Sequence, residues 1–240
     1  MEKEEFKKEL KEELSLIEIE VNDDQLEKFY LYMKLLLEWN EKMNLTAITE
    51  PKDIITKHFV DSCTASKYIE KNSKIVDCGT GAGFPGIPLA IIRDDCKFCL
   101  IDSLNKRINF LNEVVEKLEL KNVETIHTRA EDLAYNKAYR EQFDYAISRA
   151  VANMSTLLEY LLPFCKTRGK AICMKGPNID EEMSNCKKTL QILNGKIEKI
   201  DKFNLPKFDI IRHVVTVRKE GIVPQKFPRR QNKPAKEPLG

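Results

Sequence analysis

The stretch Ile75-Val-Asp-Cys-Gly-Thr-Gly-Ala-Gly-Phe-Pro-Gly-Ile-Pro-Leu-Ala-Ile91 decides the fold. It begins with apolar residues typical of a buried strand, turns through four glycines within eight residues and continues as an apolar segment. Glycine has no Cβ, so the backbone at Gly79, Gly81 and Gly83 can take positive φ values and let a ligand approach closely. Pro85 suits the first turn of a helix. The stretch predicts a strand, a tight turn and a helix whose amino-terminal end faces a nucleotide-type cofactor.

Apolar strands alternate with helical patterns on the carboxyl side of this stretch. Strands are expected at residues 74–78, 96–102, 122–127, 143–148, 170–174, 196–203 and 209–218. Helices are expected near 85–93, 103–119, 131–141, 153–164 and 178–193, with Ser103 as the N-cap of the second. This alternation is typical of an α/β fold with a parallel sheet covered on both faces. The last two strands predict a terminal hairpin, so the sheet is expected to have about seven strands.

The residues before the sheet are expected to be helical. A first helix is expected over residues 3–16. A second is expected to begin with Asp23 or Asp24 as its N-cap, and a third to run from Pro51 to Ile69. The second carries an apolar stripe expected in the core, formed by Leu26, Phe29, Tyr30, Met33, Leu36 and Leu37. The chain thereby divides into an N-terminal helical block at 1–72, an α/β core at 73–220 and a basic, proline-rich tail at 221–240. The tail is expected to be loosely ordered unless it is bound.

Composition limits the class of protein. The 240 residues are 42% hydrophobic and 32% charged, with a net charge of +2. Residues 218–240 hold seven Lys or Arg against two Glu, which indicates a polyanionic partner for that end. Seven scattered cysteines indicate a reducing compartment, and Cys96-Lys-Phe-Cys99 lacks a second ligand pair at zinc spacing. We expect no metal, no signal peptide and no membrane span, and therefore a cytoplasmic protein, as a monomer.

The choice of cofactor depends on acidic residues near the glycines. Gly81-Ala-Gly83-Phe-Pro-Gly86 matches the G-x-G-x-x-G pattern that NAD-linked oxidoreductases share. Asp77 would repel a pyrophosphate, but it can organise the loop or meet a cationic amino-acid ligand. Asp102 ends the second expected strand, where a carboxylate can bind two ribose hydroxyls. S-adenosylmethionine has an ammonium group and a ribose but no phosphate. These acids and the terminal hairpin favour it, with NAD as the alternative.

The third and fourth strands add candidate residues. Arg129-Ala130-Glu131-Asp132 follows the third strand, where an acid and an amide can hold adenine or simply begin a helix. Ser148-Arg149-Ala150-Val151 ends the fourth strand, where Arg149 can be functional or form a plain salt bridge. The Asn/Asp-Pro-Pro-aromatic tetrad of amine methylases is absent there, and no cysteine has a setting for attack on a pyrimidine. The site therefore suits an acceptor that is already nucleophilic, such as guanine N7, by in-line transfer without a general base.

Several motifs occur together. They are Asn40, Asn44-Leu-Thr-Ala47, His58-Phe-Val-Asp61-Ser62, Val76–Gly86, Arg129–Glu131, Ser148–Ala150, Lys175-Gly176, Arg212-His213 and Phe227–Arg230 with Pro234, Lys236 and Pro238-Leu239. In this combination, residues 14–239 resemble the bacterial small-subunit ribosomal RNA methyltransferase G family, formerly glucose-inhibited division protein B. The resemblance implies a Rossmann-like class I methyltransferase fold and S-adenosylmethionine as cofactor. It also implies N7-methylation of a guanine in the 530 loop of 16S rRNA, on the small ribosomal subunit.

The resemblance assigns residues by position. It implies cofactor contacts at Gly79, Phe84, Ala130, Glu131 and Arg149, which join Asp77, Gly81, Gly83 and Asp102 from the reasoning above. Candidates for RNA contacts are Asn40, Asn44, His58, Lys175, Arg212, Arg229, Arg230, Lys233 and Lys236. Arg149 and Lys175 are candidates for positioning the acceptor, and no catalytic residue is assigned.

Several alternatives stay open at this point. Asn40, Asn44 and His58 can instead fix the helical block, and His213 is expected to be a satisfied core histidine. Lys57 stands where the family pattern leads us to expect arginine. A catalytically idle RNA-binding module, suggested by the basic tail, is a further hypothesis. The guanine must be flipped out or unpaired, because its ring nitrogens are otherwise out of reach.

Overall fold

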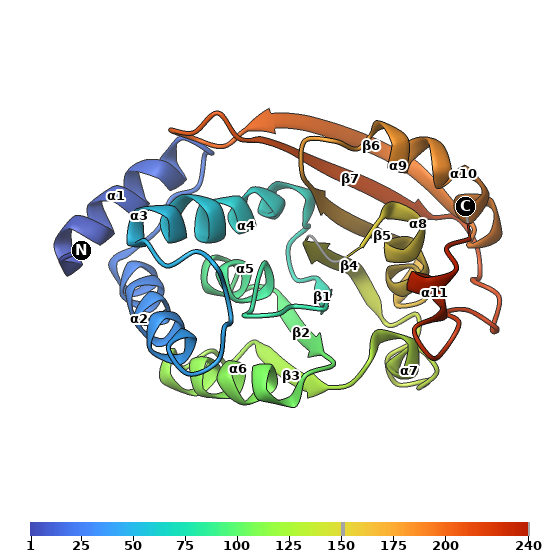
Figure 1. Cartoon of the computed structure of the whole chain (residues 1–240), viewed down its shortest axis with the longest axis horizontal. Coiled ribbons are helices and arrows are strands. Elements are labelled where there is room, and N and C mark those ends of the chain that lie inside the picture. The colour runs from blue at the N-terminus through green and yellow to red at the C-terminus, as the bar shows by residue number, and fades with distance from the viewer. Residues whose placement is uncertain (150–151, 240) are drawn as a thin grey trace.

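A computed structural model describes residues 1–149 and 152–239 of the chain (Figure 1). Its strands are β1 (Lys74–Cys78), β2 (Lys97–Asp102), β3 (Val123–His127), β4 (Phe143–Arg149), β5 (Cys165–Lys175), β6 (Gly195–Asn204) and β7 (Ile211–Lys219). They form one sheet in the order β3-β2-β1-β4-β5-β7-β6, in which β7 alone runs antiparallel to its two neighbours. The expected seven-stranded, mostly parallel sheet with a terminal hairpin is confirmed. Ala150 and Val151 of the predicted strand-four motif lie outside the described residues.

The N-terminal helices are more varied than expected. They are α1 (Lys3–Ser15), α2 (Asp23–Asn40), α3 (Pro51–Ile54), a π-helix (Ile55–Val60), α4 (Asp61–Cys63) and a 3₁₀ helix (Thr64–Tyr68). The single helix expected from Pro51 to Ile69 is therefore a succession of three helix types. Neither Asp23 nor Asp24 is the N-cap of α2. Asn22 is, because its side chain accepts the Gln25 N–H while the Gln25 side chain accepts the Asn22 N–H.

The helices between and after the strands are shorter than expected. They are α5 (Gly86–Ile92), α6 (Asn105–Lys117), α7 (Ala130–Leu133), α8 (Met154–Leu161), α9 (Asp180–Asn185), α10 (Lys187–Ile192) and α11 (Lys233–Lys236). The helix expected at 131–141 is one turn, and that at 178–193 is two short helices. Ser103 is not the N-cap of α6. Leu104 holds that position, and its N–H is bound by Asp102 Oδ1 at 2.9 Å.

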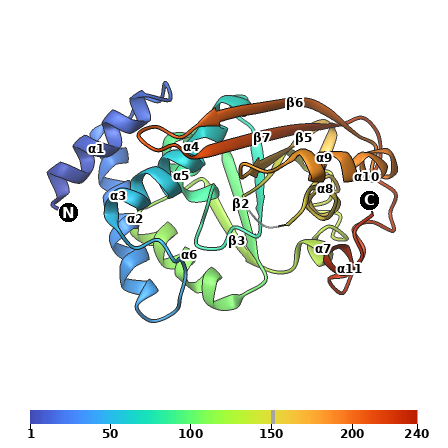
Figure 2. The same cartoon turned by 45° about the horizontal axis from the view of Figure 1, so that its top comes forward.

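Two apolar cores lie on the two faces of the sheet. Successive strand residues point to opposite faces. Ile75 and Leu100 pack with α1, α2, α5 and α6, whereas Val76 and Ile101 pack with α8 and α10. Figures 1 and 2 show the N-terminal helices at one end of the molecule and α8–α11 at the other, with the β6–β7 hairpin running along one edge.

The apolar stripe of α2 is confirmed only in part. Leu26, Phe29, Met33 and Leu36 are buried, whereas Tyr30 and Leu37 are half-buried. Tyr32 and Leu35, which lie outside the expected stripe, are buried instead. The helix packs against the α1 side and also against α5 and α6, so its buried surface is wider than one stripe.

The segment after β7 is packed on the core rather than loosely ordered. Val223 and Phe227 are buried, and the Arg140 guanidinium donates a hydrogen bond of 2.9 Å to each of their carbonyl oxygens. Thr156 Oγ1 donates to the carbonyl oxygen of the buried Pro234 at 2.8 Å. The low apolar content of this segment favours disorder, but Val223, Phe227 and Pro234 are buried against the core, whereas Ile222 is exposed.

The cysteines are free and buried. Cys96 packs in the core on one face of the sheet and Cys99 in the core on the other, so the two thiols do not form a pair. Within residues 1–149 and 152–239, no cluster of three or more His, Cys, Asp or Glu is suited to a metal ion. In the same part of the chain, no helix has the length and apolarity needed to span a membrane.

Candidate functional site

A cavity of about 480 Å³ lies at the carboxyl ends of β1 to β4. Ligands of open α/β sheets bind at this edge, near the point where the strand order reverses. Seven of the nine predicted cofactor residues line it: Gly79, Gly81, Phe84, Asp102, Ala130, Glu131 and Arg149. Other lining residues were not predicted as cofactor contacts: Leu45, Thr46, His58, Thr80, Arg107, Leu157, Tyr160 and Asn232. Of the nine, Asp77 and Gly83 do not lie on the wall.

Three backbone N–H groups of the glycine loop, those of Gly79, Thr80 and Gly81, are bound within the protein. Gly79 N and Thr80 N donate to the carbonyl oxygen of Ile101 at 2.9 and 3.1 Å, and Gly81 N donates to Asp102 Oδ2 at 2.9 Å. The φ angles of 71° at Gly79 and 64° at Gly81 make this arrangement possible. A pyrophosphate-binding loop needs such N–H groups free for its ligand. The loop is therefore poorly suited to NAD.

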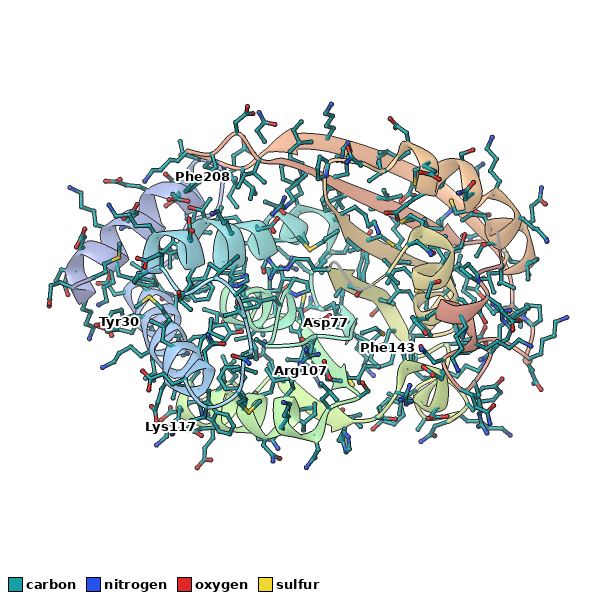
Figure 3. All side chains as sticks on the ribbon, viewed as in Figure 1. Tyr30, Asp77, Arg107, Lys117, Phe143 and Phe208 are labelled. Carbon is teal, nitrogen blue, oxygen red and sulfur yellow. The ribbon has the colours of Figure 1, made fainter. Side chains whose placement is uncertain are left out.

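Asp77 lies beneath the glycine loop, near the middle of the molecule (Figure 3). Its side chain is fully buried, and Oδ2 accepts hydrogen bonds from Thr80 Oγ1 at 2.7 Å and Gly86 N at 2.9 Å. Oδ1 has no hydrogen-bond partner among the described residues. Burial raises the pKa of Asp77 to about 7. In this structure Asp77 organises the loop, which is the first of the two roles that its position allows.

Gly83 is the point where α2 meets the loop. Its φ is +97°, and a Cβ there would lie 2.6 Å from Tyr32 Oη and 2.7 Å from Ile87 Cγ1. The Tyr32 hydroxyl donates a hydrogen bond to the carbonyl oxygen of Ala82. Sequence reasoning missed Tyr32, although it stands three residues after the buried Phe29, a helical spacing. A buried tyrosine needs a partner for its hydroxyl, and here the partner is the cofactor loop.

Two buried carboxylates stand at one end of the cavity. Asp102 accepts from Gly81 N, and its Oδ2 also lies 3.2 Å from Arg107 Nη1. Glu131 Oε1 accepts the backbone N–H of Asn232 at 3.1 Å. Carboxylates accept hydrogen bonds from hydroxyl and amine groups, so this end suits the ribose and adenine of a nucleoside.

His58, Phe84 and Arg149 form the other end of the cavity. Arg149 Nη2 lies 3.1 Å from His58 Nδ1, and His58 Nε2 lies 2.8 Å from Thr46 Oγ1. A guanidinium only donates, so Nδ1 accepts and the imidazole proton sits on Nε2, facing Thr46. Burial and the nearby Arg149 charge lower the pKa of His58 to about 3. His58 is therefore neutral with both nitrogens engaged, and it is not a free base.

Asp61 joins two arginines from distant strands. Its Oδ2 lies 3.2 Å from Arg149 Nη1 and 3.1 Å from Arg212 Nε, and the carboxylate is buried. Arg149 Nη1 also donates to the carbonyl oxygen of Lys57 at 3.0 Å. Lys57 and His58 belong to the π-helix, a form that is frequent at functional sites. Arg212, an RNA candidate, is thus directed toward an internal carboxylate.

Asn40 shapes the loop that carries Thr46. Its Oδ1 accepts the N–H groups of Leu45 at 2.7 Å and Thr46 at 2.9 Å. This supports the alternative in which Asn40 has a structural role. Asn44 is exposed in the same loop and does not line the cavity.

Lys175 and His213 also have internal partners. Lys175 Nζ lies 2.6 Å from Glu182 Oε2 and is only 8% exposed. His213 Nδ1 lies 2.8 Å from the carbonyl oxygen of Gly176, and the ring is buried, as expected of a satisfied core histidine. The Lys175 ammonium is therefore paired with the Glu182 carboxylate and is not exposed for contact with RNA.

The four tail cations differ in their surroundings. Arg229 contacts the buried Glu159 with two guanidinium nitrogens, Nε to Oε1 at 2.9 Å and Nη2 to Oε2 at 2.8 Å. Arg230 lies over the Tyr135 ring, 4.2 Å from its centroid, and remains 57% exposed. Lys233 and Lys236 are exposed. Arg229 thus anchors the tail, and the other three face solvent.

Comparisons with known proteins show which family this chain is similar to. Residues 25–215 match the family model described as rRNA small subunit methyltransferase G. The protein of that name from Acetivibrio thermocellus is 50% identical over 239 residues, which cover 97% of this chain and 98% of that protein. The one from Clostridium perfringens (strain 13 / Type A) is 50% identical over 232 residues, covering 96% and 97%.

Solved structures share the fold. M. jannaschii TYW2 in complex with AdoMet has a TM-score of 0.52 and 18% identity, over 66% of this chain and 73% of that one. A SAM-dependent methyltransferase from Aquifex aeolicus has a TM-score of 0.52 and 18% identity, over 75% and 97%. These similarities concern the fold alone, and they confirm the expected class I methyltransferase architecture.

Proposed function

The chain belongs to the rRNA small subunit methyltransferase G family, and from that premise we propose that it methylates 16S rRNA of the small ribosomal subunit with S-adenosylmethionine. The proposed acceptor is N7 of a guanine in the 530 loop. One observation carries the proposal: a single cavity gathers the glycine loop, Asp102, Glu131 and Arg149 from the ends of four strands. We place the activity in the cytoplasm and expect a monomer.

The cavity fits S-adenosylmethionine better than a dinucleotide. Asp102 and Glu131 can accept hydrogen bonds from ribose and adenine, and the amides of Gly79, Thr80 and Gly81, which a phosphate would need, are occupied. Gly79 and Gly81 leave no Cβ between the loop and the ligand. The cofactor, when bound, supplies an electrophilic methyl group on a sulfonium. The volume of about 480 Å³ lies within the usual range of ligand pockets.

The residues at the acceptor end can align a base but not remove a proton. Guanine N7 carries a free lone pair, so attack through N7 needs no general base. His58 is neutral and bound at both nitrogens, which is compatible with that chemistry. Thr46 and Arg149 border the same space and are proposed to position the guanine. Leu45 and Phe84 supply apolar surface that excludes water.

A basic rim next to the cavity is proposed to bind RNA phosphates. Arg129, Arg230 and Lys236 line a hollow that shares Arg129 and Asn232 with the cofactor cavity. Arg129 is 55% exposed, so its guanidinium is accessible to a partner. Cations around the entrance suit a flipped or unpaired nucleotide whose backbone stays outside.

The test is labelled methyl transfer to 30S particles and to free 16S rRNA, followed by chain cleavage specific for N7-methylguanosine. We expect one modified site, and comparing the two substrates identifies the preferred one. Asp102→Asn should lose most activity, whereas Asp95→Asn, at a half-buried ion pair with Arg93 outside the cavity, should retain it. Cofactor binding without incorporation into either RNA would refute the substrate assignment. Calorimetry with S-adenosylhomocysteine and NAD should show binding of the first only.

A further inference from the structure

We propose that Asn232 of the tail binds the adenine of S-adenosylmethionine through its side-chain amide, so that cofactor affinity depends on docking of residues 229–236. The inference rests on the proposed function, because it takes the nucleoside from there. The tail would then serve the cofactor site in addition to any contact with RNA.

Asn232 borders the cavity at its nucleoside end. Its backbone N–H donates to Glu131 Oε1 at 3.1 Å, and its Oδ1 accepts from Tyr160 Oη at 3.3 Å. Both partners line the same cavity. Since Oδ1 is held by Tyr160, the amide NH₂ group carries the free hydrogen-bonding capacity, and it has no partner among the described residues. The ring nitrogens of adenine are hydrogen-bond acceptors that match it.

The backbone at this point has an unusual conformation. Gln231 and Asn232 have φ angles of 61° and 57°, two consecutive non-glycine residues in the left-handed region. Asparagine tolerates this region, but glutamine does so rarely. Such conformations persist only where the surroundings enforce them, and they gather at ligand sites.

Anchors on both sides of Asn232 enforce the conformation. Arg229 binds the buried carboxylate of Glu159 through both its backbone N–H and its guanidinium. Pro234 is buried and accepts from Thr156 Oγ1 at 2.8 Å. Glu159 and Thr156 both belong to α8, the helix that also supplies Tyr160 to the cavity. One helix therefore holds the tail and shapes the pocket.

The test compares two glycine substitutions by calorimetry with S-adenosylhomocysteine. Asn232→Gly keeps the left-handed backbone and its N–H to Glu131 but removes the amide, so we expect roughly a tenfold rise in Kd, the effect of one hydrogen bond. Gln231→Gly relaxes the neighbouring residue without reaching the cavity, and its Kd should stay within about twofold of wild type. Equal melting temperatures would show that both variants are folded.

The ligand can also be shortened. 5′-Methylthioadenosine lacks the amino-acid end, and Asn232→Gly should weaken its binding by the same factor. Wild-type affinity in Asn232→Gly would overturn the assignment, as would an equal loss in Gln231→Gly, which would point to the backbone alone. If the wild-type protein itself failed to bind S-adenosylhomocysteine, the proposed function would fail as well, so the two failures are distinguishable.

Discussion

The imidazole of His58 lies flat on the phenyl ring of Phe84, with ring centroids 4.3 Å apart and planes inclined by 13°. His58 comes from the π-helix that precedes the sheet, and Phe84 comes from the glycine loop. The guanidinium carbon of Arg149 lies 4.9 Å from the centroid of the Phe84 ring. The N-terminal helices are therefore part of the site, and a change on either side of the stack should affect the other.

The neutral state of His58 predicts a pH effect on stability. Its pKa is about 3 in the folded protein and 6.5 in the unfolded one. Between these values the unfolded chain binds a proton that the folded chain does not. The contribution of neutral His58 to the free energy of unfolding is therefore complete above pH 6.5 and is lost as pH falls. Relative to His58→Gln, the wild type should lose about 1.4 kcal/mol per pH unit below pH 6. Urea unfolding of both proteins at pH 7.5 and 5.0 measures this loss. The same difference in free energy of unfolding between wild type and His58→Gln at both pH values would contradict the prediction.

Asp77 predicts the opposite trend. Its pKa is about 7 in the folded protein and 3.8 in the unfolded one, so between these values the folded chain holds the extra proton. Wild-type stability should therefore fall relative to Asp77→Asn as pH rises from 4 to 7, by about 1.4 kcal/mol per unit. Asparagine can still accept from Thr80 and Gly86.

Asp95→Asn is the matched control for Asp77→Asn. The hydrogen bonds from Arg93 lower the pKa of Asp95, so this carboxyl is charged in both states above pH 5. Its effect on the free energy of unfolding should be the same at pH 5 and pH 8. A pH-independent difference for Asp77→Asn would show that Asp77 is ionised in the fold.

Gly86 should not tolerate a methyl group. A Cβ there would lie 2.2 Å from Leu100 Cδ2 and 2.8 Å from Asp77 Oδ2, both buried. Gly86→Ala should cost about 1–3 kcal/mol of stability and weaken S-adenosylhomocysteine binding. Gly176→Ala is the control, because a Cβ at Gly176 meets no atom within 4 Å. Thermal unfolding and calorimetry distinguish the two, and equal behaviour would contradict the loop geometry.

Arg149 should require its guanidinium. It contacts Asp61, His58 Nδ1 and the Lys57 carbonyl oxygen at once, and the compact ammonium of lysine cannot reproduce that fork. Arg149→Lys should lower methyl transfer by roughly 100-fold and also weaken cofactor binding. Arg212→Lys, which retains a cation for Asp61, should have a smaller effect on both. Wild-type activity in Arg149→Lys would show that the guanidinium of Arg149 has no part in methyl transfer.

The tail cations should separate into two groups. Lys233→Gln and Lys236→Gln should each reduce the salt dependence of RNA binding, by about 0.7–0.9 in the slope of log K against log salt if a phosphate contact is lost. Arg229→Gln should instead lower stability by roughly 3 kcal/mol, because it leaves the buried Glu159 without its partner. Filter binding at several salt concentrations and thermal unfolding measure these effects. An unchanged slope for both lysine variants would exclude their role in RNA binding.

Local patterns were sufficient for the sheet architecture and for much of the lining of the cavity at the ends of β1 to β4. The periodicity of apolar residues predicted the seven-stranded sheet. The spacing of Asp77, the glycines and Asp102 predicted a ligand site at the ends of β1 and β2. These features depend on residues close together in the chain. Parallel strands also bring their carboxyl ends to one edge, so Glu131 and Arg149 were expected near the same edge of the sheet. Their assignment as cofactor contacts came from the resemblance to the family, because the residues alone left a helix start and a plain salt bridge open.

Contacts between distant residues required the folded chain. Arg212 reaches Asp61 across 151 residues and Asn232 reaches Glu131 across 101. Whether an arginine faces RNA or a buried carboxylate depends on what packs around it, and neither periodicity nor composition encodes that. For the same reason the tail was expected to be loose, whereas Glu159 and Thr156 on α8 hold it in place. The glycine loop could be predicted from its own residues. The hydrogen bond from Tyr32 to Ala82 and the place of Asn232 in the cavity wall arise only when the sheet and helices are assembled.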